Sequence, residues 1–252
     1  MPVWVISDLH LSFGTPDKSM DVFGPAWENH GEKIQENWTK VIKKDDLILI
    51  PGDISWAMRI DEALIDLHWL HALPGTKVII KGNHDYWWPS NTKLKEILPP
   101  SIHFIYNSAF LWNGIAVGGT RLWDTPEYQF NSLISYKENP YQKKLTIEEV
   151  EGKKAQEESI FVRELERLKL SLKQMDTKAK IRIAMTHYPP ISADLQTSRT
   201  SKILEEYNIQ YCVFGHLHNV KKEQPIFGEK NGILYAFTSC DYLDFKPMLL
   251  IP

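Results

Sequence analysis

The sequence predicts an α/β protein in which buried strands alternate with amphipathic helices. Five short runs of apolar and β-branched residues have the length and the nearly continuous hydrophobicity of strands that are buried on both faces. These runs are residues 3–6, 47–50, 78–80, 181–185 and 211–214. The segments between them repeat apolar residues at helical spacing, and this alternation is typical of layered α/β folds.

Three segments carry the helical pattern. Residues 26–42 and 61–70 each place apolar side chains on one face of a helix. The strongest pattern is that of residues 160–172. Its apolar stripe consists of Phe161, Leu165, Leu168 and Leu172.

Further strands are expected in three places. Residues 102–120 alternate apolar and polar side chains and are broken at Asn113-Gly114, and an Asn-Gly pair is a strong hairpin signal. Residues 233–238 and 248–251 are shorter candidates near the end of the chain.

Residues 121–157 are the least regular part of the chain and are rich in aromatic residues. Two interpretations stay open, an ordered surface insertion and a lid over an active site, because long irregular segments in compact domains often carry function. No shift in composition marks a second domain. We therefore expect one domain over residues 1–252.

The composition is that of an ordinary globular chain. Its 252 residues are 43% hydrophobic and 24% charged, and the formal net charge is −3, which disfavours a strongly basic nucleic-acid binder. Two cysteines are too few for a disulfide scaffold. The chain opens without the basic segment and apolar core of a secretory signal, and no apolar run approaches the roughly 18 residues of a membrane span. A cytoplasmic location is the expectation.

Metal-ligating side chains follow each of the five buried runs. They are Asp8 and His10, then Asp53, then Asn83 with His84 and Asp85, then His187, and finally His216 with His218. In open α/β sheets, sites form beyond the carboxyl ends of the strands, so we expect these groups to converge on one rim. Carboxylate, amide and imidazole ligands together suit Mn, Fe, Co or Zn, and the set contains no thiolate. Each motif alone is ordinary turn chemistry, whereas all five in order indicate a site.

The ordered motifs resemble those of the calcineurin-like metallophosphoesterases. They are Asp8-x-His10, Gly52-Asp53, Gly82-Asn83-His84-Asp85, His187 and Gly215-His216-x-His218. The resemblance spans residues 8–218 and is closest to a group of predicted phosphohydrolases, on segments 18–21, 27–30, 52–57 and 83–88. It implies a four-layer αββα sandwich as the fold.

The same resemblance implies a centre of two divalent ions, Mn²⁺, Fe²⁺/Fe³⁺ or Zn²⁺. One ion would be held by Asp8, His10, Asp53 and His218, and the other by Asp53, Asn83, His187 and His216. Asp53 would then bridge the pair. A hydroxide shared by the two ions would attack phosphorus in line.

His84 and Asp85 are the implied catalytic residues. In the family, the histidine at the position of His84 contacts the phosphate or protonates the leaving oxygen, and the acidic residue after it orients the imidazole. The alternative for Asp85 is a local turn cap.

The expected activity is hydrolysis of a phosphomonoester or phosphodiester in a small soluble substrate. Phosphoprotein substrates are disfavoured, because the Asp-Arg pair of the protein Ser/Thr phosphatases is absent after Asp53 and because Asp85 stands where they carry Glu. Two alternatives stay open, a metal-stabilised interaction module without turnover and a pyrophosphatase of the lipid A precursor. The complete ligand set favours the enzyme. Long nucleic acids are not expected as partners, and the sequence points to no protein partner.

Two further groups of residues lie near the motifs. The aromatic group consists of Trp56, Tyr86, Trp87, Trp88 and Trp123. Core packing is the preferred interpretation over base stacking, although Trp87 or Trp88 is expected to line the site wall. Arg59 and Arg121 are candidate phosphate contacts that the sequence alone does not place.

Overall fold

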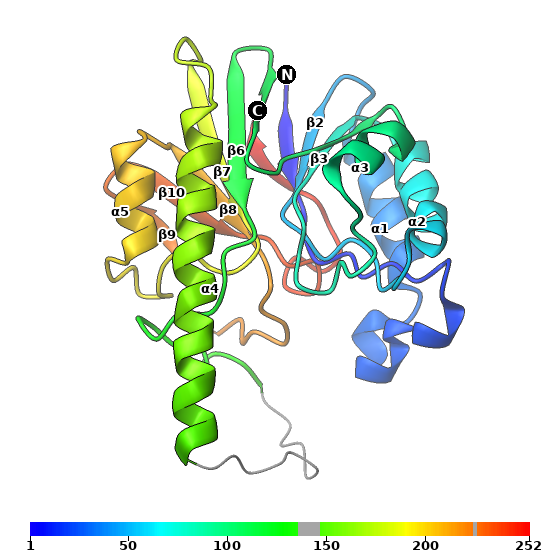
Figure 1. Cartoon of the computed structure of the whole chain (residues 1–252). Coiled ribbons are helices and arrows are strands. Elements are labelled where there is room, and N and C mark those ends of the chain that lie inside the picture. The colour runs from blue at the N-terminus through cyan, green and yellow to red at the C-terminus, as the bar shows by residue number, and fades with distance from the viewer. Residues whose placement is uncertain (136–146, 224–225) are drawn as a thin grey trace.

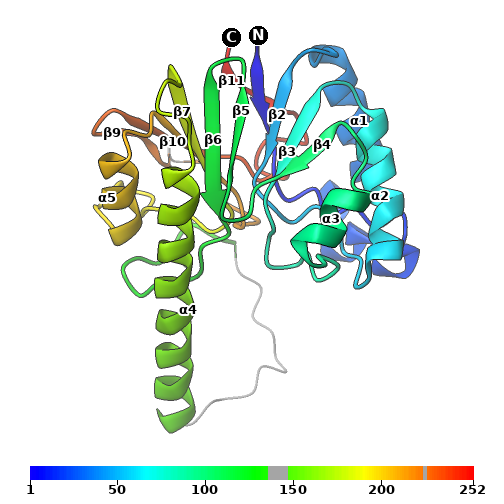
Figure 2. The ribbon, with the colours of Figure 1, turned by 45° about the horizontal axis from the view of Figure 1, so that its top comes forward.

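Two β-sheets face each other, and helices cover the outer face of each (Figure 1). The structure is a computed structural model that describes residues 1–135, 147–223 and 226–252. The helices α1, α2 and α3 lie on one outer side, and α4 and α5 lie on the other (Figure 2). This arrangement confirms the predicted α/β fold with its four layers.

The first sheet has five strands in the order β11-β1-β2-β3-β4. Their bounds are Met248–Ile251, Val3–Val5, Leu47–Ile50, Thr76–Ile79 and Ile102–Phe104. Strands β1 to β4 are parallel, and β11 runs antiparallel at the edge. The outer face of the first sheet is covered by α1 (His30–Val41), α2 (Ile60–Ala72) and α3 (Asn91–Ile97).

The second sheet has six strands in the order β5-β6-β7-β8-β10-β9. Their bounds are Ala109–Trp112, Ile115–Thr120, Ile181–Thr186, Tyr211–Phe214, Ile233–Phe237 and Gly228–Lys230. The strands β6, β7, β8 and β10 are parallel. The outer face of the second sheet packs on α4 (Ile147–Lys173) and α5 (Arg199–Glu206). The apolar side chains of these helices form one buried core with that face.

The inner faces of the two sheets share a third core. Leu49 and Val78 of the first sheet lie in one buried cluster with Val117, Ile183 and Val213 of the second. The central strands are therefore buried on both faces, which is why their sequences read as continuous apolar runs rather than as alternating ones.

Residues 102–120 differ from the predicted hairpin. Residues 102–104 form β4 and pair with β3 in the first sheet, and only β5 and β6 form a hairpin. That hairpin turns at Asn113-Gly114, where both residues have positive φ angles of 48° and 81°, as a type I′ turn requires. The chain thus crosses from one sheet to the other between Phe104 and Ala109.

Other helices begin at residues that differ from the predicted ones. The helix expected over residues 26–42 begins at His30, after the 3₁₀ turns η1 (Pro16–Lys18), η2 (Met20–Phe23) and η3 (Pro25–Trp27). Helix α4 begins at Ile147, thirteen residues before the start predicted at residue 160. Helices α3 and α5 and strand β9 were not predicted. Helix α3 buries only Leu94, and α5 spans only eight residues, so neither has a long periodic pattern. Part of the irregular segment, residues 136–146, lies outside the described residues, so the lid stays a prediction.

Lys77 is a cation buried inside this framework. Its side chain is fully buried on β3, and its Nζ atom donates to the carbonyl of Leu73 and lies 6.0 Å from the centre of the Trp38 ring. Burial lowers the pKa of Lys77 from 10.5 to about 8. Between these values the unfolded chain binds more protons than the folded one, so this residue makes stability rise with pH.

We expect Lys77→Met to remove that contribution. The variant should exceed the wild type in unfolding free energy most clearly near pH 7.5, and the difference should shrink as the pH rises to 10.5. Denaturant unfolding at both pH values measures it, with Lys40→Met on the exposed face of α1 as the control. A difference that is the same at both pH values would contradict this account of Lys77.

Candidate metal centre

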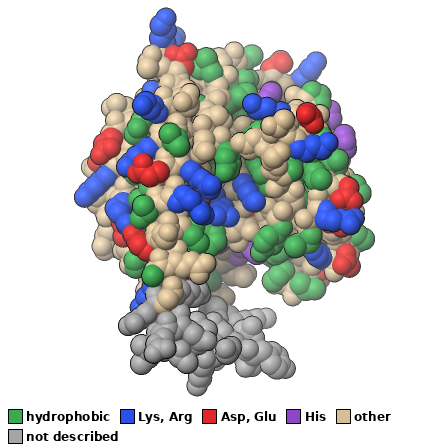
Figure 3. All heavy atoms as spheres, viewed as in Figure 1, with side chains coloured by type: hydrophobic (Ala, Val, Ile, Leu, Met, Phe, Trp, Pro, Cys, Tyr) green, Lys and Arg blue, Asp and Glu red, His purple; other side chains and the backbone are tan. Residues whose placement is uncertain are grey.

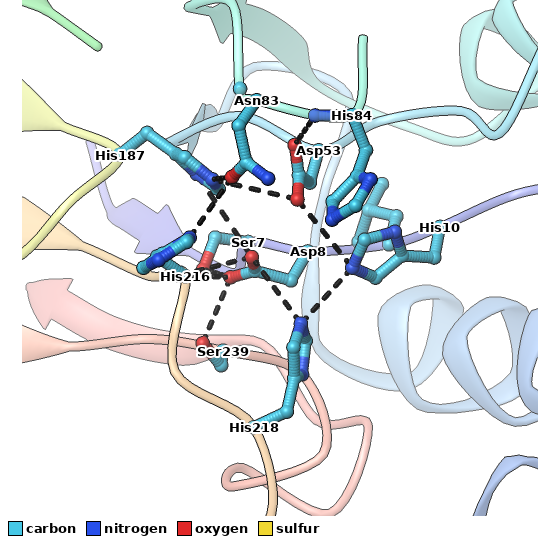
Figure 4. Close-up of polar contacts among 12 residues, drawn as sticks. Ser7, Asp8, His10, Asp53, Asn83, His84, His187, His216, His218 and Ser239 are labelled. Atoms are coloured by element: carbon cyan, nitrogen blue, oxygen red, sulfur yellow. Dashed lines mark hydrogen bonds and ion pairs between the residues drawn. The ribbon is translucent and has the colours of Figure 1, made fainter. Parts of the chain in front are cut away.

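The predicted ligands lie together where strands of both sheets end (Figure 4). Asp8 and His10 follow β1, Asp53 follows β2, and Asn83 follows β3. The second sheet contributes His187 after β7, and His216 and His218 after β8. All seven side chains project into one polar cluster between the sheets, as the strand-end pattern predicts.

Asp53 stands at the middle of this cluster. Its Oδ2 atom lies 3.6 Å from His10 Nε2 and 3.5 Å from His187 Nε2. This oxygen is buried and has no hydrogen-bond partner among the described residues. The other oxygen, Oδ1, accepts a hydrogen bond of 2.8 Å from the backbone N–H of His84. A buried carboxylate oxygen with free lone pairs is costly unless a cation binds it.

On one side of Asp53, three ligand atoms form a compact group. The ligand atoms of Asp8, His10 and His218 all lie within 4.8 Å of one another. His10 Nε2 faces His218 Nε2 at 3.1 Å, and His218 Nε2 lies 3.8 Å from Asp8 Oδ1. Facing imidazole nitrogens and a carboxylate at these distances are the donors that a transition-metal ion takes.

On the other side, a second group contains Asp8, Asp53 and His187, whose ligand atoms also lie within 4.8 Å of one another. The Oδ1 atom of Asn83 lies 2.6 Å from His187 Nε2 and 2.9 Å from His216 Nδ1. Asp8 belongs to both groups, whereas the family resemblance gave it to the first alone. The side chains thus form two candidate metal-ligating groups that share Asp8, and Asp53 Oδ2 lies near a histidine of each.

The loops that carry the ligands have unusual backbone conformations. Asp8, His10, Asp53 and His216 have φ angles of 57°, 45°, 52° and 74°, in the left-handed region that costs energy for residues other than glycine. A β-carbon on Gly82 would meet the backbone and carboxylate of Asp53. The close approach of these loops thus explains the glycine before Asn83, and the clustering of strained residues indicates a functional site.

Neighbouring groups orient the ligands. Ser7 Oγ and Ser239 Oγ donate to Asp8 Oδ2 at 2.5 and 2.9 Å. His187 Nδ1 bonds to the carbonyl of Pro51 at 2.9 Å, and His218 Nδ1 bonds to Asp241 Oδ1 at 3.1 Å. These contacts fix each imidazole with Nε2 turned toward the cluster, which is how proteins orient metal-binding histidines.

Ser7, Ser239 and Asp241 were not predicted. Ser239 and Asp241 follow β10, so the same strand-end pattern that identified the ligands extends to them. Their signal was weak because Ser and Asp after a strand are common in turns.

Asp85 does not take the role expected of it. Its carboxylate accepts hydrogen bonds from the backbone N–H groups of Asp53, Ile54 and Gly82 at 3.0, 2.9 and 2.7 Å. The Nδ1 atom of His84 has no partner among the described residues. Asp85 therefore joins the loop of Asp53 to the loop of Asn83, closer to the turn-cap alternative than to orientation of the His84 ring.

Among the tryptophans of the predicted aromatic group, Trp56 rather than Trp87 or Trp88 contacts two histidines of the site. Its ring centre lies 4.9 Å from that of His10, stacked at 24°, and 4.4 Å from that of His84. Trp87 is buried and Trp88 packs against it, both in the core under α2 and α3. The expectation that one of these two rings lines the site is therefore not met.

The charges of the cluster need a positive partner. Burial raises the pKa of Asp8, whereas the pKa of Asp53 is held well below its usual range despite burial, by His187 and His10. Burial acts to lower the pKa of His187, but the Asp53 and Asp8 carboxylates raise it to about 9. A proton on His187 or a bound divalent ion supplies the compensating charge, and an ion would displace the proton.

Sequence comparison matches most of the chain to one family model. The model described as calcineurin-like phosphoesterase matches residues 1–220, which include all seven predicted ligands. Two curated relatives share shorter stretches, the Gene 66 proteins of Mycobacterium phage D29 (38% identical over 84 residues) and phage L5 (34% over 90 residues). These stretches cover 33% and 35% of this chain, which spans only 40% and 42% of the two relatives.

Solved structures share the fold at low sequence identity. Phosphopantetheinyl hydrolase from Mycobacterium tuberculosis is 14% identical with a TM-score of 0.52, over 100% of this chain and 96% of that one. GAP50, the anchor in the inner membrane complex of Plasmodium, is 13% identical with a TM-score of 0.50, over 96% and 72%. None of the described helices has the length and apolar content to cross a membrane.

Substitution of Asp53 tests the metal centre. We expect Asp53→Asn to lose at least one bound metal ion, because the change removes the negative charge that lies between the two donor groups. Elemental analysis after loading with Mn²⁺ or Zn²⁺ and gel filtration measures the metal per chain. Asp61→Asn, at the exposed start of α2, is the matched control. Two equivalents retained by Asp53→Asn would refute the bridging assignment.

Proposed function

Because the chain belongs to the calcineurin-like phosphoesterase family, whose members are hydrolases acting on phosphoester bonds, we propose that it cleaves a phosphomonoester or phosphodiester bond of a small substrate with two divalent ions. The observation that carries the proposal is the buried, unpartnered Oδ2 atom of Asp53 between His10 and His187. Asp8, His10, Asp53 and His218 would hold one ion, and Asp53, Asn83, His187 and His216 the other.

The charge of this centre suits a phosphate ester. Two dications carry +4 and the carboxylates of Asp8 and Asp53 carry −2, so the sum is +2. When bound, such ions supply a water acidic enough to act as a nucleophile at neutral pH, and charge that offsets the phosphoryl oxygens. The Asp8 carboxylate is held by hydrogen bonds from two serine hydroxyls and one backbone N–H group. By fixing this carboxylate, these contacts also fix where the ions, and hence the phosphate, would bind.

We infer that the side chain of His84 acts on the substrate. Its backbone N–H donates to Asp53 Oδ1, and its ring contacts the rings of both His10 and Trp56, with centres 5.6 and 4.4 Å away. Burial lowers the pKa of His84, which favours the neutral imidazole. A neutral ring beside the ligands can hydrogen-bond a phosphoryl oxygen or pass a proton to the leaving oxygen. Asp85 would be a positioning residue that holds the two loops in register.

An apolar substrate group is the second candidate. Phe23 is exposed and stacks on Trp56 at 6.4 Å and 9°, and Trp56 in turn stacks on His10. An aromatic path thus leads from His10 through Trp56 to the exposed ring of Phe23. This path favours a lipid-like leaving group more than the sequence did, so the pyrophosphatase alternative remains in the test.

Loss of His84 separates catalysis from metal binding. We expect His84→Ala to keep its metal and to lose turnover by about 10²- to 10⁴-fold, the usual size of general acid–base effects. Metal content and kcat on a chromogenic phosphoester are measured on the same preparation. His68→Ala, on the exposed face of α2, serves as the control. Normal kcat would show that turnover does not need His84, and loss of metal would make His84 a ligand. Absence of turnover in the metal-loaded wild type would favour the non-catalytic interaction module.

A parallel substrate screen tests the substrate class. We expect bis-p-nitrophenyl phosphate or p-nitrophenyl phosphate to be hydrolysed in the presence of Mn²⁺, with activity abolished by a chelator. Nucleotides, sugar phosphates, a phosphopeptide and a lipid pyrophosphate are compared at equal concentration. If the lipid alone reached kcat/KM of about 10⁴ M⁻¹s⁻¹ or more, the small-substrate proposal would be replaced by the second candidate.

A further inference from the structure

A pocket lined by Lys and Arg side chains lies near the candidate metal centre. We call it the basic pocket, defined by Lys81, Arg121 and Arg167 with Asn107 and Glu164. It encloses about 240 Å³, room for several water molecules at about 30 Å³ each and so for a group the size of phosphate. Lys and Arg side chains gather near the middle of this face, between α4 and the end of β3 (Figure 3).

The basic pocket holds more positive than negative charge. Three cations face one carboxylate, so its net charge is +3 − 1 = +2. Glu164 is buried and already engaged, since it accepts from Arg167 Nη1 at 2.5 Å and from Thr120 Oγ1 at 2.7 Å. Neither Lys81 nor Arg121 has a carboxylate within 4.0 Å among the described residues. Two cations are therefore available to an anion.

The two guanidinium groups are held in place by aromatic rings. Arg121 lies over Trp123 with 4.6 Å between Cζ and the ring centre, and Arg167 lies over Tyr106 at 5.3 Å. Held in this way, a guanidinium group loses little freedom when it binds, and it presents paired donors that match a phosphate. Arg59, the other arginine noted in the sequence, instead pairs with Asp61 at 2.9 Å on the surface.

Two walls of the basic pocket are continuous with the loops of the metal centre. Lys81 directly precedes Gly82 and Asn83. The carbonyl of Arg121 accepts hydrogen bonds from the backbone N–H groups of His187 and Tyr188 at 3.1 and 2.9 Å. The basic pocket therefore borders the loops that carry Asn83 and His187, next to the place proposed for the first phosphate.

We propose that the basic pocket binds a second phosphate group of the substrate, so that the substrate is a bisphosphate or a similar molecule with two phosphate groups. This inference rests on the proposed function for the first phosphate. It adds that Arg121 is a specificity-determining residue, which contacts the phosphate that is not cleaved.

The binding step is tested without turnover. Isothermal titration of chelator-treated protein with inorganic phosphate measures the affinity, and this readout does not depend on the metals. We expect Arg121→Met to weaken phosphate binding about 10- to 100-fold, the loss typical of a hydrogen bond to a charged group. Arg121→Lys should recover part of it. Arg59→Met, at the exposed arginine that pairs with Asp61 outside the pocket, is the control.

Kinetics then identify the source of the phosphate. With Mn²⁺, kcat/KM is compared for adenosine 5′-monophosphate and adenosine 3′,5′-bisphosphate. A preference for the bisphosphate that falls at least tenfold in Arg121→Met supports the proposal. Equal phosphate affinity in wild type and Arg121→Met would overturn the site. Lost phosphate affinity with an unchanged substrate preference would overturn the assignment to substrate and leave a free anion as the occupant. Failure of hydrolysis with phosphate binding intact would count against the proposed function alone.

Discussion

The burial of two carboxylates, Asp8 and Asp53, where the two sheets meet is the constraint on which the rest of the site depends. Both are almost completely inaccessible to solvent, and a charge in such a place is strongly destabilising unless positive or hydrogen-bonding groups surround it. Asp8 and Asp53 follow strands of the first sheet. The imidazoles of His187 and His218, which are among the groups around these carboxylates, follow strands of the second sheet. The site can therefore exist only in the folded chain with both sheets packed.

The join between the sheets explains how the chain secures this arrangement. After β1, the backbone N–H of Ser7 donates to the carbonyl of Thr238, and the N–H of Cys240 donates back to Ser7, at 2.9 and 3.0 Å. The segment after β10 of one sheet is thus tied to the segment after β1 of the other. Ser239 lies within that tie and binds the Asp8 carboxylate, so the contact that joins the sheets also fixes a ligand.

The sequence was informative about whatever depends on local pattern. Buried strands and the polar residues after them are visible in single segments, so the fold class and the convergence of the ligands could be predicted. The direction in which a side chain points could not be predicted. Asp85 and Trp87, for example, point toward residues that only the tertiary packing brings near them. Asp85 contacts residues 53–55, about thirty positions away. The same limit explains β4, since a strand of three residues, Ile-His-Phe, carries no sign of which sheet it joins.

If the centre binds a phosphate ester as proposed, selectivity has to come from residues outside the proposed ligands, because those ligands would recognise only the phosphate. Here the two flanks differ in chemistry: Trp56 and Phe23 form an aromatic side, and the basic pocket forms a cationic one. Each flank also touches the centre, since Trp56 stacks on His10 and the Arg121 carbonyl binds the N–H of His187. A substrate group that binds to either flank therefore contacts residues that are in direct contact with the proposed ligands. Binding energy from non-reacting parts of the substrate can then position the phosphate, and enzymes use such energy to raise kcat rather than only to lower KM.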